Sequence, residues 1–170
     1  MQVFVRSVIL FFIVAFSVAG FSGKTSAQGF FDHPLRGKAA PNIVLEKLEG
    51  GRVGLIDQVK GKQAIVFFWA TWCPHCREQI QALNARRSEL EKAGIMIEFV
   101  DVGEPKGQVK AFLKDHQMSD NVFLDIDTQA SEAYSVYGIP TLYFIGRDGI
   151  VHEALNEFPD NFEKILGQKP

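Results

Sequence analysis

The residues best suited to chemistry lie within one short stretch, residues 69–76. Cys73 and Cys76 are the only cysteines of the 170-residue chain, and Pro74 and His75 separate them. Two cysteines at this spacing can form a disulfide with each other, and the thiolate of one can attack a disulfide in another molecule. The pair therefore indicates thiol-disulfide exchange.

A zinc site is one alternative use of such a pair, because zinc takes four ligands and the pair supplies two. The chain contains no second pair, and the histidines outside the stretch follow no ligand spacing; these are His33, His116 and His152. An inert remnant of an active site is the other alternative. We expect no metal and no organic cofactor, since a dithiol cycles between its reduced and disulfide forms without one.

The elements around the cysteines predict how they are positioned. Residues 64–69 form an uninterrupted apolar run, which predicts a strand buried on both faces. Pro74 suits the first turn of a helix, so Cys73 is expected at a helix N-terminus. Amide N–H groups there favour the thiolate, which makes Cys73 the attacking group. Cys76 lies one turn deeper and is expected to resolve the mixed disulfide.

Residues 68–76, Phe-Trp-Ala-Thr-Trp-Cys-x-x-Cys, resemble the active site of the thioredoxin superfamily. Residues 137–141, Tyr-Gly-Ile-Pro-Thr, resemble the cis-proline loop that these proteins place against the reactive cysteine. The resemblance implies a thiol-disulfide oxidoreductase that acts on protein thiols and disulfides. It also implies that the substrate is bound by four residues: Trp72, Ile139, Pro140 and Thr141.

The beginning of the domain resembles the extracytoplasmic TlpA/ResA branch of this superfamily. Pro41, a predicted hairpin around residues 49–51 and a predicted helix at 106–116 match that branch. Peroxiredoxins begin in a related way, but they place a threonine three residues before the peroxide-reactive cysteine. Here Thr71 lies two residues before Cys73, so we expect no peroxidase.

The pattern of the rest of the chain predicts one α/β domain over residues 41–170. We expect a thioredoxin-like fold with a mixed central sheet flanked by helices, an N-terminal β-hairpin and a central helical insertion. Helices are expected at 74–93, 106–116, 128–137 (capped by Asp127 or Thr128) and 161–166. Strands are expected at 64–69, 95–102 and 122–124, and a second hairpin at 142–155.

Residues 1–27 are similar to an export signal, which predicts an extracytoplasmic, periplasmic location. Arg6 precedes an apolar run at 8–21, shorter than the roughly 20 residues of a membrane-spanning helix. Small residues at 25–27 offer a cleavage site before Gln28, although an uncleaved membrane anchor is the alternative. Residues 28–40 lack periodicity and are expected to form a tether. We expect a soluble domain that a membrane-bound oxidoreductase recharges.

Composition limits the partners. The formal net charge is −2, and the first 27 residues contribute Arg6 and Lys24 with no acids, so −2 minus +2 leaves −4 for the remainder. This balance offers no basic surface for a nucleic acid. The 46% of hydrophobic residues suffices for one core, and we expect a monomer. The alternative function is a redox-inert module that binds a client or a metal-delivery partner through Trp72 and Pro140.

The positions that handle protons differ from those of the related proteins. Thioredoxins often bury an aspartate six residues before the first cysteine, where this chain has Phe67. Reducing proteins of the TlpA/ResA branch often have a glutamate where this chain has Gln79. Glu98 and Asp101 are the remaining candidate acids, although solvation at strand ends is the simpler interpretation. The sequence leaves open which group deprotonates the second cysteine.

His75 bears on the direction of electron flow. A nearby imidazole favours the thiolate of Cys73, and the same Pro-His pair occurs in oxidising thioredoxin-fold proteins of the DsbA type. With the missing acids, this favours a pair slightly more oxidising than a typical thioredoxin. The TlpA/ResA resemblance implies the opposite, since those relatives mostly reduce, including apocytochrome cysteines during haem attachment. Oxidant and reductase therefore stay open alternatives.

Overall fold

The computed structural model describes residues 33–116 and 121–167. The predicted export signal and the first part of the predicted tether lie outside these residues. No helix within the described part is both long and apolar enough to cross a membrane.

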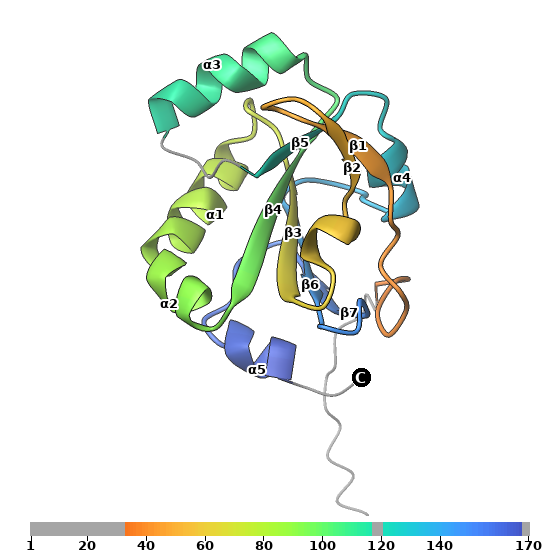
Figure 1. Ribbon diagram of the computed structural model, residues 1–170. Helices are drawn as coiled ribbons and strands as arrows, with labels where there is room; N and C mark the ends of the chain where they lie inside the picture. Colours follow the sequence, from red (N-terminus) through yellow and green to blue (C-terminus); the bar gives the residue numbers. More distant parts are fainter. Residues whose placement is uncertain (1–32, 117–120, 168–170) are drawn as a thin grey trace, which may run out of the picture. The chain divides into compact units, whose positions relative to one another are not determined.

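The domain is built on a seven-stranded mixed sheet with the strand order β2-β1-β5-β4-β3-β6-β7 (Figure 1). Its strands are β1 (Val44–Lys47), β2 (Arg52–Gly54), β3 (Gln63–Trp69), β4 (Ile95–Val102), β5 (Val122–Asp125), β6 (Thr141–Ile145) and β7 (Val151–Leu155). Strands β1 and β2 form the predicted N-terminal hairpin, and β6 and β7 form the second hairpin. The predicted thioredoxin-like fold is confirmed.

The candidate site residues predicted from the sequence lie at one end of the strands, where the C-terminal ends of the parallel strands are found. Strand β4 pairs in parallel with both β3 and β5, whereas β6 runs antiparallel to β3. The C-terminal ends of β3, β4 and β5 therefore meet the N-terminal end of β6. Every residue of β3 after Gln63 is buried, as the apolar run predicted. The cysteine stretch follows β3 and the proline loop precedes β6. Since β3 and β6 are adjacent in the sheet, the two segments lie at the same end of it.

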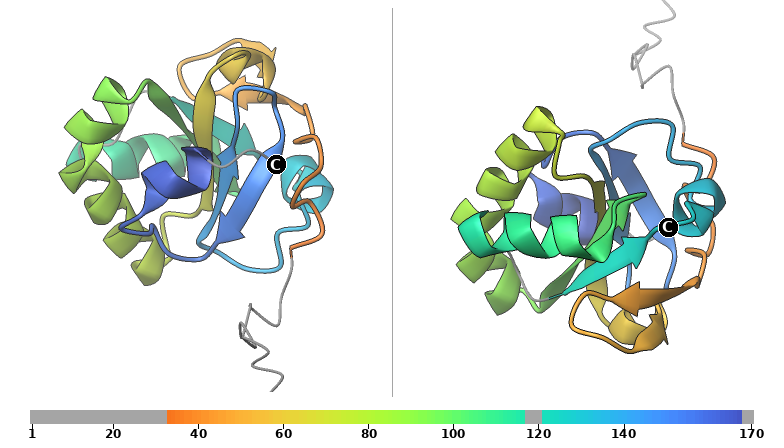
Figure 2. Two further views of the ribbon diagram at one scale, coloured as in Figure 1. Left: turned by 90° about the horizontal axis from the view of Figure 1, so that it is seen from below. Right: turned by 90° about the horizontal axis from the view of Figure 1, so that it is seen from above.

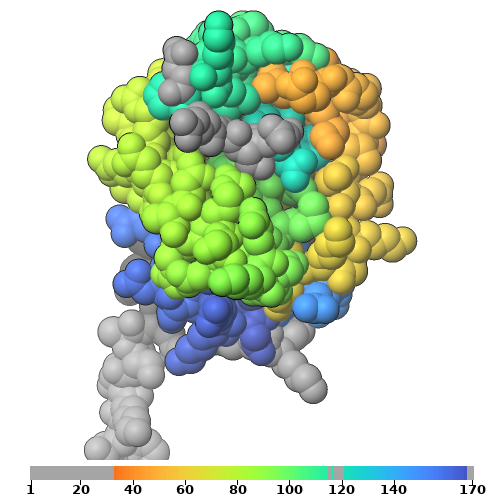
Figure 3. Space-filling view, turned by 60° about the vertical axis from the view of Figure 1, so that its left-hand side comes forward, coloured from red at the N-terminus to blue at the C-terminus, as the bar shows by residue number. Residues whose placement is uncertain are grey.

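Helices cover both faces of the sheet (Figure 2). One face packs against α1 (Pro74–Ala85), α2 (Arg87–Lys92), α3 (Lys106–His116) and α5 (Phe162–Gly167). The opposite face packs against α4 (Gln129–Ala133) and the 3-10 helix η1 (Asp57–Val59). Figure 3 shows the first face, with α1 and α2 in the middle, α3 above them and α5 below. The predicted helical insertion is α3, which lies beside α1.

The helix expected at 74–93 is interrupted at Arg86. This residue has φ −104° and ψ 8°, and its N–H bonds to the carbonyl of Leu83, three residues back, at 3.2 Å. The Arg86 guanidinium lies 5.0 Å from the centre of the Phe162 ring and 2.7 Å from the Glu89 carboxylate. The break therefore gives Arg86 contacts with α5 and α2 in place of a continuous helix. Gly94 ends α2 with φ +70°, as its position suggested.

The helix expected at 128–137 is wrong in length and in its cap. Helix α4 ends at Ala133, and Tyr137 is 89% exposed instead of buried. The cap comes from Asp125, whose carboxylate accepts from the N–H groups of Ala130 (2.9 Å) and Ser131 (2.8 Å). Asp125 is the last residue of β5 and is fully buried. Its carboxylate reaches the N-terminus of α4 because of the tertiary structure, which the sequence pattern did not indicate.

The second half of the predicted tether contacts the domain. The N–H of Gly37 bonds to the carbonyl of Val151 in β7 at 2.8 Å, and the N–H of Ala40 bonds to that of Gly149 at 2.9 Å. The imidazole of His33 lies 3.0 Å from the hydroxyl of Tyr143. These contacts fix the described part of residues 28–40 along the β6–β7 side of the sheet.

Candidate active site

Cys73 and Cys76 form a disulfide at the N-terminus of α1, with their Cα atoms 5.3 Å apart. Strand β3 ends at Trp69, and Pro74 is the first residue of the helix, as predicted. Cys73 is the N-cap: its sulfur accepts from the N–H of Cys76 at 3.1 Å. The same N–H would stabilise a thiolate on Cys73 in the dithiol form, because charged acceptors make the stronger hydrogen bonds.

The proline loop lies directly against this sulfur. The peptide bond between Ile139 and Pro140 is cis, and the carbonyl oxygen of Ile139 is 3.9 Å from Sγ of Cys73. The hydroxyl of Thr141 donates to the carbonyl of Gly138 at 2.7 Å, so this side chain holds the loop. Pro140 is buried and Ile139 is half-buried. The structure therefore brings together the cysteine pair and the loop that the sequence placed 66 positions apart.

Asn156 supports the loop from the far side and was missed in the sequence. Its side-chain amide donates to the carbonyl of Pro140 at 2.7 Å. It follows β7, sixteen residues after the proline, and only the β6–β7 hairpin brings it back to the loop. A single asparagine after a strand carries no signal that would have identified it.

The two tryptophans of the stretch separate into structural and exposed positions. Trp69 is fully buried and packs against Phe99 and Phe112, with ring centres 6.5 and 5.4 Å apart. Trp72 is 64% exposed immediately before Cys73. The described surface near the disulfide therefore has a large aromatic side chain that is accessible to a partner.

A buried carboxylate fixes the segment before the disulfide. Glu104 follows β4 and accepts from the N–H of Thr71 at 2.6 Å and from its hydroxyl at 2.7 Å. The amide of Gln108 on α3 donates to the same carboxylate. Glu104 was not among the predicted site residues. The available signal was its place after a strand parallel to β3, since the C-terminal ends of parallel strands meet at one edge.

Asp101 and Glu98 are fully buried, so the expectation that they are solvated at strand ends is wrong. The pKa of Asp101 is raised to about 8, first by burial and then by a hydrogen bond with Glu104 and the charge of Glu104, while the bond from the Glu104 N–H opposes the rise. Asp101 therefore holds a proton at neutral pH. It lies opposite Trp69 in the sheet, beside the cysteine segment. Burial also raises the pKa of Glu98 to about 7.

The two positions where relatives carry an acid have other contacts here. Phe67 is buried in the core. Gln79 is nearly buried, and its side-chain oxygen accepts from the N–H of Phe158 at 2.7 Å. His75 is half-exposed, with Nδ1 2.7 Å from the Glu78 carboxylate and Nε2 3.8 Å from that of Glu157. Its imidazole therefore contacts carboxylates, and no hydrogen bond among the described residues joins it to the sulfur of Cys73.

Within the described residues, no group of three or more His, Cys, Asp or Glu side chains is arranged to hold a metal ion.

Comparison with known proteins places this site in a family. The family model of the AhpC/TSA family matches residues 36–154. The thiol-disulfide oxidoreductase ResA of Bacillus cereus is 34% identical over 160 residues, which cover 92% of this chain and 86% of that protein. This chain belongs to the AhpC/TSA family and is a thiol-disulfide oxidoreductase of the ResA type. ResA of Bacillus subtilis is 36% identical over 78% of this chain and 70% of its own length.

Solved structures agree with this assignment. The thioredoxin domain of a thiol-disulfide oxidoreductase from Bacteroides vulgatus superposes with a TM-score of 0.69 at 25% identity, covering 78% of this chain and 98% of that domain. A thiol:disulfide interchange protein of the thioredoxin family from Chlorobium tepidum has a TM-score of 0.63 at 26% identity, covering 77% and 94%. The predicted resemblance to TlpA/ResA-like oxidoreductases is confirmed. The exclusion of a peroxidase stays a prediction.

Proposed function

We propose that Cys73 is the attacking thiol and Cys76 the resolving thiol in disulfide exchange with client proteins. The observation that supports this assignment is the Cys76 N–H, which points at the sulfur of Cys73 and not the reverse. Cys73 also retains slight exposure, 4% against 0% for Cys76, and lies against the Ile139 carbonyl. An attacking sulfur needs both a stabilised thiolate and access to the client.

The reaction balances through the two sulfurs alone. The Cys73 thiolate attacks one sulfur of a client disulfide, and the other client sulfur leaves as a thiolate and takes a proton from solvent. The Cys76 thiolate then attacks Cys73, closes the disulfide and releases the second client thiolate. Two electrons pass from the domain to the client. The reverse sequence oxidises a client dithiol, and Trp72 and the backbone of Ile139 bind the client in either direction.

The direction of electron flow and the cellular partners belong to the same proposal. The N-capping hydrogen bond and the absence of acids at Phe67 and Gln79 favour a pair slightly more oxidising than a typical thioredoxin, whereas similarity to ResA favours a reductase. The pattern of residues 1–27 supports an extracytoplasmic location. There the domain acts as a monomer and a membrane-bound oxidoreductase recharges it.

Trapping of the mixed disulfide tests the proposal. A Cys76→Ser variant is expected to accumulate covalent client complexes that dithiothreitol releases, because no second thiol resolves them. The matched Cys73→Ser variant is expected to trap nothing. If Cys76→Ser also traps nothing while the unmodified domain still binds clients, the domain is the redox-inert binding module. If only Cys73→Ser traps clients, the roles of the two cysteines are reversed.

A further inference from the structure

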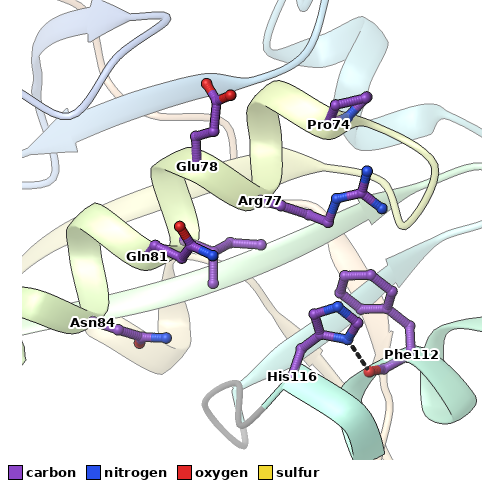
Figure 4. Close-up of a pocket in the computed structure, with 8 residues that line it drawn as sticks. Pro74, Arg77, Glu78, Gln81, Asn84, Phe112 and His116 are labelled. Carbon is purple, nitrogen blue, oxygen red and sulfur yellow. Dashed lines mark hydrogen bonds between the residues drawn. The ribbon is translucent and has the colours of Figure 1, made fainter.

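A groove begins beside the disulfide and follows α1 away from it (Figure 4). It has a volume of about 480 Å³ and lies between α1 and α3. Pro74, which directly follows Cys73, borders one end, and Asn84 in the last turn of α1 borders the other. The groove therefore begins next to the cysteine to which a client polypeptide would be attached.

The α3 side of the groove is flat and preorganised. The rings of Phe112 and His116 stack with centroids 3.9 Å apart and an interplanar angle of 7°. Nδ1 of His116 lies 2.9 Å from the carbonyl oxygen of Phe112, so this nitrogen is the donor. Phe112 packs in turn on the buried Trp69. The groove thus has a fixed aromatic wall that an extended chain can contact along its length.

Arg77 gives the groove its charge. It lies one helical turn after Cys73, and its N–H bonds to the Cys73 carbonyl at 3.4 Å. Its side chain is half-buried and has no ion pair or hydrogen bond with another described residue. Among the described residues that line the groove, Glu78 is the one carboxylate; it is bound to His75 at 2.7 Å and points away from Arg77 in Figure 4. The groove therefore presents a guanidinium that has no partner among the described side chains, beside an aromatic wall.

We propose that this groove binds an acidic segment of the client polypeptide, with Arg77 pairing with a client carboxylate. The inference rests on the proposed role of Cys73 in forming the mixed disulfide. A guanidinium matches a carboxylate with two parallel hydrogen bonds, and partial burial strengthens the pair relative to one in open water. One helical turn spans about 5.4 Å and an extended chain about 3.3 Å per residue. The acidic residue consequently lies about two positions from the client cysteine.

Peptides provide the test without any change to the protein. The reduced domain is mixed with symmetric disulfide dimers of a short peptide that carries Asp, Asn or Lys about two residues from its single cysteine. Each second-order rate is divided by the rate of the same dimer with dithiothreitol, which removes differences in intrinsic reactivity. We expect the Asp peptide to react about tenfold faster than the Asn peptide and the Lys peptide to be slowest, with the difference in KM and reduced by salt.

Three variants separate binding in the groove from the effect of the overall charge of the domain. Arg77→Glu is expected to reverse the preference, whereas Arg147→Glu, in the β6–β7 turn at the opposite end of the sheet, leaves it unchanged. Arg77→Gln removes the charge while retaining a polar side chain, and it is expected to abolish the preference. Equal normalised rates of the wild-type domain with all three peptides would overturn the inference and leave the exchange function intact. If the reduced domain reacts with none of the dimers and the oxidised domain reacts with none of the reduced peptides, the proposed function itself is overturned.

Discussion

The buried carboxyl of Glu98 links the stability of the fold to pH. It lies on β4 opposite Val66, is fully buried, and neither of its oxygens has a hydrogen-bond partner among the described residues. Burial raises its pKa from 4.5 to about 7, while the charges of Lys47 and Lys62 oppose the rise. The perturbation that isolates this effect is Glu98→Gln, which keeps the shape of the side chain and removes its ionisation.

The size of the effect on the free energy of unfolding follows from the shift in the pKa of Glu98. Between pH 4.5 and pH 7 the folded carboxyl keeps a proton that the unfolded chain has released, so the free energy of unfolding falls as pH rises. Each pH unit removes about 1.4 kcal/mol, and the interval from 4.5 to 7 therefore removes roughly 3 kcal/mol. The stabilisation is complete below pH 4.5 and is lost as pH passes through about 7.

Urea unfolding of the oxidised domain, followed by the fluorescence of Trp69 and Trp72, measures this effect. From about pH 4 to about pH 8 we expect Glu98→Gln to gain roughly 3 kcal/mol relative to the wild type. The control is Glu91→Gln, an exposed residue of α2, whose difference from the wild type is expected to stay constant. A difference for Glu98→Gln that does not change with pH would refute the reasoning, since the carboxyl would then be ionised in the folded state.

Substitutions at three further positions test the contacts of the site. Glu104→Ala leaves the Thr71 N–H and hydroxyl without their acceptor, and we expect a loss of about 2–4 kcal/mol in urea unfolding, with a smaller loss for Glu104→Gln. Asn156→Ala removes the donor to the Pro140 carbonyl; exchange with protein thiols should slow several-fold, and exchange with dithiothreitol should not change. His75→Ala should lower the reduction potential in glutathione buffers by roughly 30 mV or less. An unchanged potential would exclude a role for this imidazole.

Local features of the site were predictable because they depend on neighbours in the chain. Pro74 can occupy only a few positions in a helix, and this placed Cys73 at the N-terminus of α1. The uninterrupted apolar run predicted a strand buried on both faces, and β3 has that environment. The loop at Pro140 was identified by resemblance, and its contact with Cys73 depends on the antiparallel pairing of β6 with β3.

The predictions were wrong for polar side chains whose hydrogen-bond partners are brought to them by the tertiary structure. Asp127 or Thr128 was expected to cap α4, but the buried carboxylate of Asp125 does so from the end of β5. Asp101 was expected to be solvated, but it is fully buried and accepts a hydrogen bond from the N–H of Glu104. The side chains of these acids are ordinary in sequence. The groups that surround them belong to other helices and strands, and the hydrophobic periodicity of the sequence does not indicate which elements pack together.

The sequence by itself determined the chemistry and the architecture: a Cys-x-x-Cys pair at a helix N-terminus, in a mixed sheet flanked by helices. Both features depend on residue types, on short spacings and on the hydrophobic periodicity, which are properties of residues close together in the sequence. Only the tertiary structure decided which groups surround the pair, namely the Glu104 carboxylate, the Asn156 amide and the groove beside Arg77. The physical reason is that burial and pairing of polar groups depend on strand order and helix packing, which bring together residues far apart in the chain.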